Sequence, residues 1–156
     1  RLLLSAHGLP ERTIARGDPY QWQVERTAAA LVEALGIEKL DYSVCYQSRV
    51  GPLKWIGPAT DAEIRQAGAD GKGVIVAPIA FVSEHSETLV ELDIEYGKLA
   101  HESGVVDYIR VPTVGVQPDF IEGLARLVMD AAQKGGTVNG CGERICPAGF
   151  TRCIHP

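Results

Sequence analysis

Short apolar runs alternate with longer amphipathic stretches along this chain, and that alternation limits the fold more than any other feature. The runs predict strands at Leu2–Ala6, Asp41–Tyr46, Gly73–Pro78 and Asp107–Val111. The stretches predict helices at Tyr20–Leu35, Thr60–Gly68, Ser86–Glu102 and Pro118–Gln133. Strands that alternate with helices form βαβ units around a parallel sheet. We therefore expect an α/β fold with a doubly wound, mainly parallel four-stranded sheet and helices on both faces.

Capping residues mark the ends of these predicted helices. Asp18 can cap the first helix, with Pro19 in its first turn, and Gly36 can stop it. Ser83 is a suitable cap for the third helix, and Gly135 ends the last one. We divide the chain into a folded domain at residues 1–135 and a cysteine-containing tail at residues 136–156.

The composition fits one globular domain and argues against nucleic-acid binding and against a membrane-spanning segment. The chain has 156 residues, 46% of them hydrophobic, which is enough for a substantial core. A net charge of −5 argues against nucleic acid as a partner. No apolar run reaches the roughly 18–20 residues that a membrane span requires. Because the chain opens directly on a predicted strand at Arg1, we expect it to be a piece of a longer protein.

The cysteines predict a reducing, cytoplasmic environment. Four of them are too few for a disulfide scaffold, and Cys45 lies in an apolar strand, where a core position is expected. The other three, Cys141, Cys146 and Cys153, lie close together in the tail.

Three segments follow predicted strands directly and should meet at one edge of the sheet, where ligands of such folds bind. The first contains His7, which can accept a proton or bind a metal, or can simply bond to nearby backbone at a strand end. Trp55 lies three residues after the second segment, Tyr46–Pro52, and Phe81 lies in the third, Ile79–Glu87. Both aromatic side chains suit core packing, or the walls of a site for a flat apolar ligand.

Carboxylates follow the third strand. Glu87, Glu91 and Glu95 are spaced four apart, so one helix would present them as a stripe of like charges that repel by a few tenths of a kcal/mol per pair. Such a stripe can bind a hard cation, and His85 lies beside it. The helix dipole alone also favours Glu87 at a helix start, and Glu91 and Glu95 could be merely solvated. The chain has no Gly-x-Ser-x-Gly elbow and no phosphate-binding glycine loop.

Four segments of the chain resemble ferrochelatase in order and in spacing. The resemblance runs from about residue 2 to residue 134 and covers only the carboxyl-terminal half of that enzyme. It is most specific in the last segment. The segments are Ser5-Ala-His-Gly-Leu-Pro10, Arg16-Gly-Asp-Pro-Tyr20, Gln47-Ser-Arg-Val-Gly-Pro-Leu-Lys-Trp-Ile-Gly-Pro58 and Pro78-Ile-Ala-Phe-Val-Ser-Glu-His-Ser-Glu-Thr-Leu-Val-Glu-Leu-Asp-Ile-Glu-Tyr96.

The resemblance implies a Rossmann-like half-domain of an enzyme that inserts ferrous iron into a porphyrin, with no metal cofactor required for the insertion. It implies that His7 and Glu87 are the facing catalytic pair, that His85 supports them, and that His7, Glu87, Glu91 and Glu95 contact the metal. The acidic helix is expected to carry a π-type widening. Phe81 and Trp55 are expected to contact the porphyrin.

The resemblance also implies partners. The amino-terminal half of the enzyme would supply the opposite wall of the site, so we expect little activity from this piece alone. Some ferrochelatases bind a [2Fe–2S] cluster through carboxyl-terminal cysteines, for which Cys141, Cys146 and Cys153 are the candidates, whereas Cys45 is a poor fourth ligand.

Two other functions stay open at this point: a half-sized homodimeric chelatase, and a tetrapyrrole or metal carrier without catalysis. The sequence leaves open which porphyrin is bound and whether the protein touches a membrane peripherally.

Overall fold

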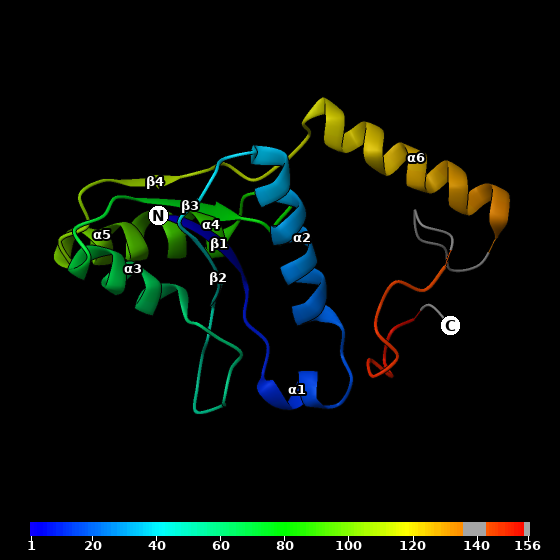
Figure 1. The fold of residues 1–156 in the computed structure, drawn as a ribbon, viewed down its shortest axis with the longest axis horizontal. Coiled ribbons are helices and arrows are strands. Elements are labelled where there is room, and N and C mark those ends of the chain that lie inside the picture. The colour runs from blue at the N-terminus through cyan, green and yellow to red at the C-terminus, as the bar shows by residue number, and fades with distance from the viewer. Residues whose placement is uncertain (136–142, 155–156) are drawn as a thin grey trace.

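A computed structural model describes residues 1–135 and 143–154. Its four strands form one parallel sheet in the order β2-β1-β3-β4 (Figure 1). The expected doubly wound parallel sheet is therefore confirmed, with no strand end more than one residue from the predicted one. The strands are β1 (Leu2–His7), β2 (Tyr42–Gln47), β3 (Val74–Pro78) and β4 (Tyr108–Arg110).

The four predicted helical stretches are all helical. A short helix at Glu11–Ala15 was not expected, because five residues are too few to show a helical period. The Asp18 Oδ1 accepts a hydrogen bond from the Tyr20 N–H at 2.9 Å, but Pro19 and not Asp18 occupies the cap position of the next helix, one residue later than predicted. The helices are α1 (Glu11–Ala15), α2 (Tyr20–Leu35), α3 (Thr60–Ala69), α4 (Ser86–Leu89), the π-helix η1 (Glu91–Glu95), α5 (Tyr96–Glu102) and α6 (Pro118–Lys134).

The stretch predicted as one helix at Ser86–Glu102 is three segments, with the expected π-type widening in the middle. The Glu95 N–H donates to the Val90 carbonyl five residues earlier, at 2.9 Å. A π-turn disturbs the regular carbonyl pairing, and here the Tyr108 hydroxyl donates to the Leu92 carbonyl at 2.8 Å. A partner from the neighbouring strand thus helps to satisfy the backbone of η1.

The predicted cap of this helix was wrong. His85, and not Ser83, is the cap: its Nδ1 accepts the Glu87 N–H at 3.1 Å, and the Thr88 hydroxyl accepts the His85 N–H at 3.0 Å. The helix begins two residues later than a Ser83 cap would require, so His85 takes the position from which a side chain can reach the free N–H groups.

The interior strand β1 contributes buried apolar residues to both faces of the sheet, because successive residues of a strand point to opposite faces. Leu3 packs with residues of α3, η1 and α5 on one face. Leu4 packs with Ala28 of α2 on the other. The helices therefore lie on both faces, as expected, and the carboxyl ends of the strands open toward α1 and the loop after β2 (Figure 1).

The α2 face is only partly covered within the described residues. Ile75 on β3 and Ile109 on β4 are 43% and 49% exposed. The last helix, α6, projects away from the sheet instead of packing on it (Figure 1), and none of its residues is buried. Its amphipathic pattern was predicted correctly, but its apolar side is exposed at Ile121, Leu124, Leu127, Val128 and Met129.

Residues 143–154 return to the start of α2. The Arg152 N–H donates to the Gly17 carbonyl at 3.1 Å, and the rings of Trp22 and Phe150 lie 6.2 Å apart. Cys45 is fully buried, as expected for a core residue. No helix in the described ranges is both long and apolar enough to cross a membrane.

Two glycines test how closely the α3–α5 side of the fold is packed. A Cβ atom on Gly68 would lie 2.0 Å from the Ser103 carbonyl oxygen, whereas one on Gly123 in α6 would meet nothing within 4 Å. We expect Gly68→Ala to lower the free energy of unfolding by about 1–3 kcal/mol or more, because backbone atoms must move. Gly123→Ala should raise it by about 0.5–1 kcal/mol, since alanine favours a helix.

Urea unfolding of both variants in the full-length protein measures these changes. An unchanged midpoint for Gly68→Ala would show that α3 and the end of α5 are not in close contact.

Candidate active site

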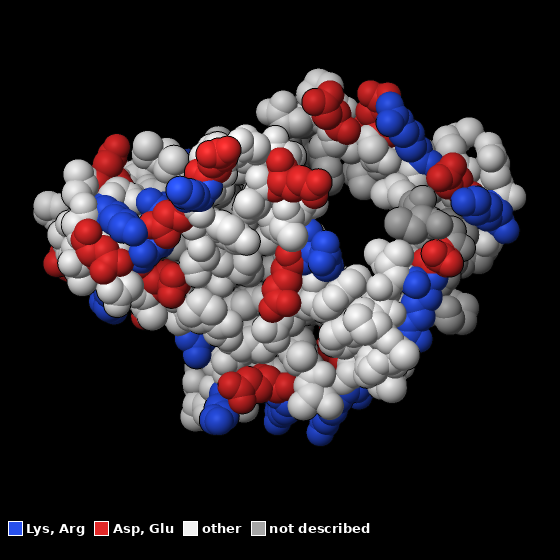
Figure 2. Space-filling model, viewed as in Figure 1, with Lys and Arg blue, Asp and Glu red and all other residues white. Residues whose placement is uncertain are grey.

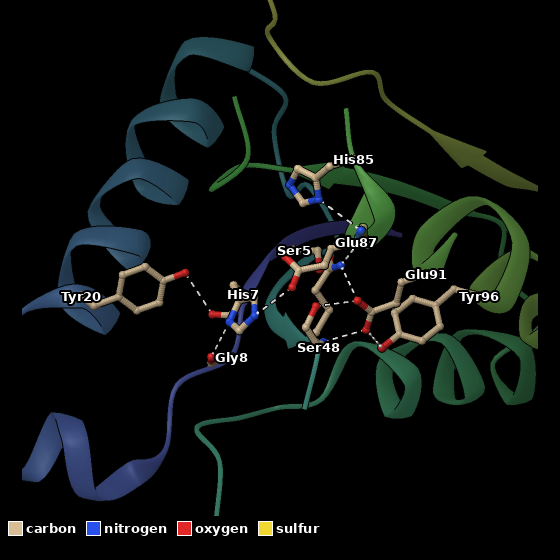
Figure 3. A network of polar contacts seen from close by, with 10 residues as sticks. Ser5, His7, Gly8, Tyr20, Ser48, His85, Glu87, Glu91 and Tyr96 are labelled. Carbon is tan, nitrogen blue, oxygen red and sulfur yellow. Dashed lines mark hydrogen bonds and ion pairs between the residues drawn. The ribbon is translucent and has the colours of Figure 1, made fainter. Parts of the chain in front are cut away.

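The carboxyl end of β1, the loop after β2, the first half of α3 and the segment α4–η1–α5 border an open cavity of about 880 Å³. The three loops predicted to converge do so, because β1, β2 and β3 are adjacent and parallel. Of the predicted site residues, five line this cavity: His7, Trp55, Glu87, Glu91 and Glu95. Figure 3 shows His7, Glu87 and Glu91 with their polar contacts.

His7 and Glu87 face each other across the edge of the sheet. His7 Nε2 lies 3.2 Å from Glu87 Oε1, and both side chains are more than a third exposed. His7 Nδ1 lies 2.6 Å from the Gly8 carbonyl oxygen, which can only accept, so Nδ1 carries a hydrogen. The Nε2–Oε1 contact then joins two acceptors unless a proton lies between them. The pair can therefore hold a proton between these two atoms and exchange it at the cavity surface.

The backbone of His7 is held from α2. The Tyr20 hydroxyl donates to the His7 carbonyl at 2.9 Å. Burial raises the pKa of Tyr20, which keeps this hydroxyl protonated as a donor. The backbone contact weighed for His7 is therefore present, and its other ring nitrogen faces Glu87 at the cavity, where a role in proton transfer or metal binding stays a prediction.

His85 contacts the backbone of Glu87 and does not line the cavity. As the cap of α4 it fixes the Glu87 N–H, and its ring packs against Phe81 with centroids 5.2 Å apart. Phe81 itself is 7% exposed and does not line the cavity formed by the described residues. A role for Phe81 in contacting a ligand stays a prediction.

Trp55 forms part of the rim. Residues 48–57, which we call the rim loop, follow β2 and border the cavity through Trp55 and five other residues. The indole packs over Gly8, where a Cβ atom would lie 3.3 Å from Trp55 Cε3. The Trp55 Nε1–H is buried without a hydrogen-bond acceptor in the described part of the chain.

The three glutamates do not form an equivalent stripe. Glu91 accepts four hydrogen bonds from protein groups, whereas Glu87 faces His7 and Glu95 borders the cavity farther along the helix. The π-turn between Glu91 and Glu95 disturbs the four-residue spacing on which the stripe was predicted. Among residues 1–135 and 143–154, no group of three or more His, Cys, Asp or Glu side chains is close enough to bind a metal.

A charged cluster behind the site was not predicted from sequence. Arg110 on β4 contacts both Asp93 carboxylate oxygens at 2.6 and 2.7 Å, and donates to Glu84 Oε1 at 2.6 Å. Burial acts to raise the pKa of Glu84, but hydrogen bonds from Thr113, Thr88 and Arg110 outweigh it and lower the pKa to about 2. Arg110 thus ties the π-helix and the loop before α4 to the end of β4.

Two tail cysteines come together. Cys146 is buried, and a hydrogen bond with Cys153 raises its pKa. Cys141 lies outside the described residues. A role of these thiols as cluster ligands stays a prediction, and Cys45 is enclosed in the core.

These features define a class: a single Rossmann-like parallel sheet with a histidine–carboxylate pair at its ligand-binding edge and a π-helix beside it. The family model for ferrochelatase matches residues 1–132. The chain belongs to the ferrochelatase family.

Relatives agree over nearly the whole chain. A ferrochelatase from Caulobacter vibrioides is 59% identical over 98% of this chain, one from Phenylobacterium zucineum is 57% identical over 98%, and one from Rickettsia conorii is 48% identical over 99%. The chain spans only 44% to 46% of the length of these proteins.

A solved structure shows the same fold in a short protein. A protein from Marinobacter aquaeolei, described as the cobalamin (vitamin B12) biosynthesis protein CbiX, superposes with a TM-score of 0.60 at 19% identity. The match covers 85% of this chain and 96% of that one.

The lowered pKa of Glu84 predicts a specific loss of stability in acid. Unfolding returns the carboxyl to its ordinary pKa of 4.5, so its stabilising effect is complete above that value and disappears as the pH falls toward about 2. Glu84→Gln should therefore be less stable than wild type near neutral pH. This difference in the free energy of unfolding should become smaller as the pH falls from 4.5 toward about 2.

Urea midpoints at several pH values measure the gap in the full-length protein. The exposed carboxylate Glu38 provides the control, and Glu38→Gln should show no such narrowing. If the stability difference between wild type and Glu84→Gln stayed constant with pH, the lowered pKa of Glu84 would be contradicted.

Proposed function

We propose that this chain is the carboxyl-terminal half of a ferrochelatase that inserts Fe²⁺ into protoporphyrin IX or a related porphyrin. The observation that carries the proposal is the contact of His7 with Glu87 at the edge of a cavity, within segments that belong to the ferrochelatase family. The cavity is within the size range of small-molecule sites.

The reaction needs two protons to leave the pyrrole nitrogens as Fe²⁺ binds to them. His7 Nε2 is suited to accept them one at a time, because Nδ1 donates to Gly8 and each proton can leave through Glu87 before the next arrives. Glu87 is suited to take a proton on from Nε2, or to contact the arriving cation, since its carboxylate lies beside that nitrogen and is exposed. Glu95 borders the same cavity and extends the acidic surface.

Trp55 and the rest of the rim loop would contact the porphyrin. The loop supplies apolar surface at the cavity mouth through Val50, Leu53 and Trp55. The predicted roles of Phe81 and His85 are indirect in this arrangement, because Phe81 packs behind His85 and His85 caps α4.

The missing half of the protein would close the site. The relatives are about twice as long as this chain, and the cavity has walls from one sheet only. The exposed apolar residues of α6 and of the α2 face are suited to pack against another part of the same protein. We expect little metal insertion from this piece alone. A cytoplasmic location, with or without peripheral membrane contact, stays a prediction.

A second function is favoured by one observation. The match covers 96% of the CbiX chain, so the same fold also makes up nearly all of a solved chain of about this size. A half-sized chelatase would complete its cleft by forming a homodimer. A native mass of twice the chain, together with metal insertion by the isolated chain, would favour that function.

The proposed reaction predicts the effect of replacing the facing pair. In the full-length parent, His7→Ala and Glu87→Ala should each lower the rate of Fe²⁺ or Zn²⁺ insertion by about 100-fold or more while porphyrin binding persists, because proton transfer contributes about that much. Loss of porphyrin fluorescence measures insertion. His101→Ala, an exposed histidine on α5, is the matched control and should leave the rate unchanged.

Porphyrin binding by the wild type without any metallation would favour a carrier and reject the proposal.

We also propose that the tail binds a [2Fe–2S] cluster in the full-length protein. The adjacent thiols of Cys146 and Cys153 fit two ligands, Cys141 is the predicted third, and the fourth would come from outside this chain. A cluster there would bind the tail to the rest of the protein.

Purified without oxygen, the wild type should contain iron and sulfide and show visible charge-transfer absorption. Cys146→Ser and Cys153→Ser should lose it, whereas Cys45→Ser should keep it.

A further inference from the structure

Glu91 is the most hydrogen-bonded carboxylate of the site. Its Oε1 accepts from the Ser48 N–H at 2.6 Å and from the Tyr96 hydroxyl at 2.9 Å. Its Oε2 accepts from Gln47 Nε2 at 3.0 Å and from the Ser48 hydroxyl at 2.5 Å. A carboxylate has about four acceptor positions, and here four protein donors occupy them (Figure 3). A metal ion could contact Glu91 only after one of these bonds was broken.

The donors are fixed by their own surroundings. Gln47 is fully buried, its Oε1 accepts from the Ser5 hydroxyl at 2.8 Å, and its Nε2 also donates to the Glu87 carbonyl at 2.6 Å. Its amide orientation is therefore determined, because Nε2 faces two acceptors. Burial, and then the neighbouring Glu91 charge, raise the pKa of Tyr96, so its hydroxyl remains a donor.

Ser48 begins the rim loop in an uncommon conformation. Its φ is +59°, in the left-handed region that serine adopts at a cost. Both of its donor groups bond to Glu91, which holds the chain in this conformation. The direction in which the rim loop leaves β2 thus depends on a side chain of the π-helix.

We propose that Glu91 is a positioning residue that locks the rim loop, through Ser48, onto the π-helix, and that it is not a metal ligand. The Glu91–Ser48–Gln47 network sets the place of Trp55 at the cavity mouth and of the Glu87 backbone beside His7. The part of this role that concerns turnover rests on the proposed metal insertion, whereas the attachment of the loop does not.

Hydrogen exchange tests the attachment without any activity. Glu91→Gln puts an NH₂ group where two donors converge, so two of the four hydrogen bonds are lost. In the full-length protein, amide exchange across residues 48–57 should become at least about tenfold faster, as expected when a hydrogen bond to a charged group is removed. Glu95→Gln is the matched control on the same helix, and should leave exchange of the rim loop unchanged. Unchanged exchange in Glu91→Gln would overturn the proposal.

Kinetics separate positioning from ligation. If Glu91 acts through Ser48, then Ser48→Ala and Glu91→Gln should both raise the KM for the porphyrin several-fold and lower kcat, and the double variant should be about as impaired as the worse single variant. Tyr96→Phe should show a weaker form of the same change. Tyr108→Phe also removes a hydroxyl bonded to the π-helix, but not to Glu91, and should leave the porphyrin KM unchanged.

The proposal would be rejected if Glu91→Gln raised the KM for the metal while Ser48→Ala did not, and if the effects of the two substitutions added in the double variant. Glu91 would then be a metal ligand. If the wild type does not insert metal at all, the proposed function fails, while the exchange experiment still decides whether Glu91 holds the loop.

Discussion

The buried amide of Gln47 is the interaction on which the rest of the site depends. It lies at the end of β2, in register with His7 of β1, and bonds to Ser5, the Glu87 carbonyl and Glu91. One side chain therefore fixes the spacing between the two strands and the helical segment that faces them. Burying such a group is costly unless every hydrogen bond is made, so the network tolerates little displacement of any member.

The network divides the carboxylates into two kinds. Glu87 is exposed and shares a contact with His7 Nε2, which leaves it able to exchange protons or meet a cation. Glu91, one turn along, has its acceptor positions filled. Residues that look equivalent in the sequence thus differ in what they can do. The π-turn at Glu91–Glu95 also changes the direction of Glu95 relative to Glu91, compared with a regular helix.

The sequence predicted the sheet, its helices and the convergence of three loops, because hydrophobic periodicity and the parallel topology determine them. Periodicity could not predict the roles of Ser48, Tyr96 or Arg110. Their importance arises from contacts between residues distant in the chain, such as Arg110 with Glu84 and Asp93. Gln47 gave one usable signal, a polar residue ending an apolar strand, but its partners could not be inferred. The Ser83 cap was wrong because helix starts are set by which side chain reaches the free N–H groups.

The central claim is that the His7–Glu87 pair is open to a reacting cation while Glu91 is closed to it. Anomalous diffraction from crystals of the full-length protein soaked in Zn²⁺ tests this directly. The account predicts a peak within about 2.0–2.2 Å of His7 Nε2 or the Glu87 carboxylate, and none coordinated by Glu91. A zinc peak on the Glu91 carboxylate, with Ser48 displaced from it, would contradict the account.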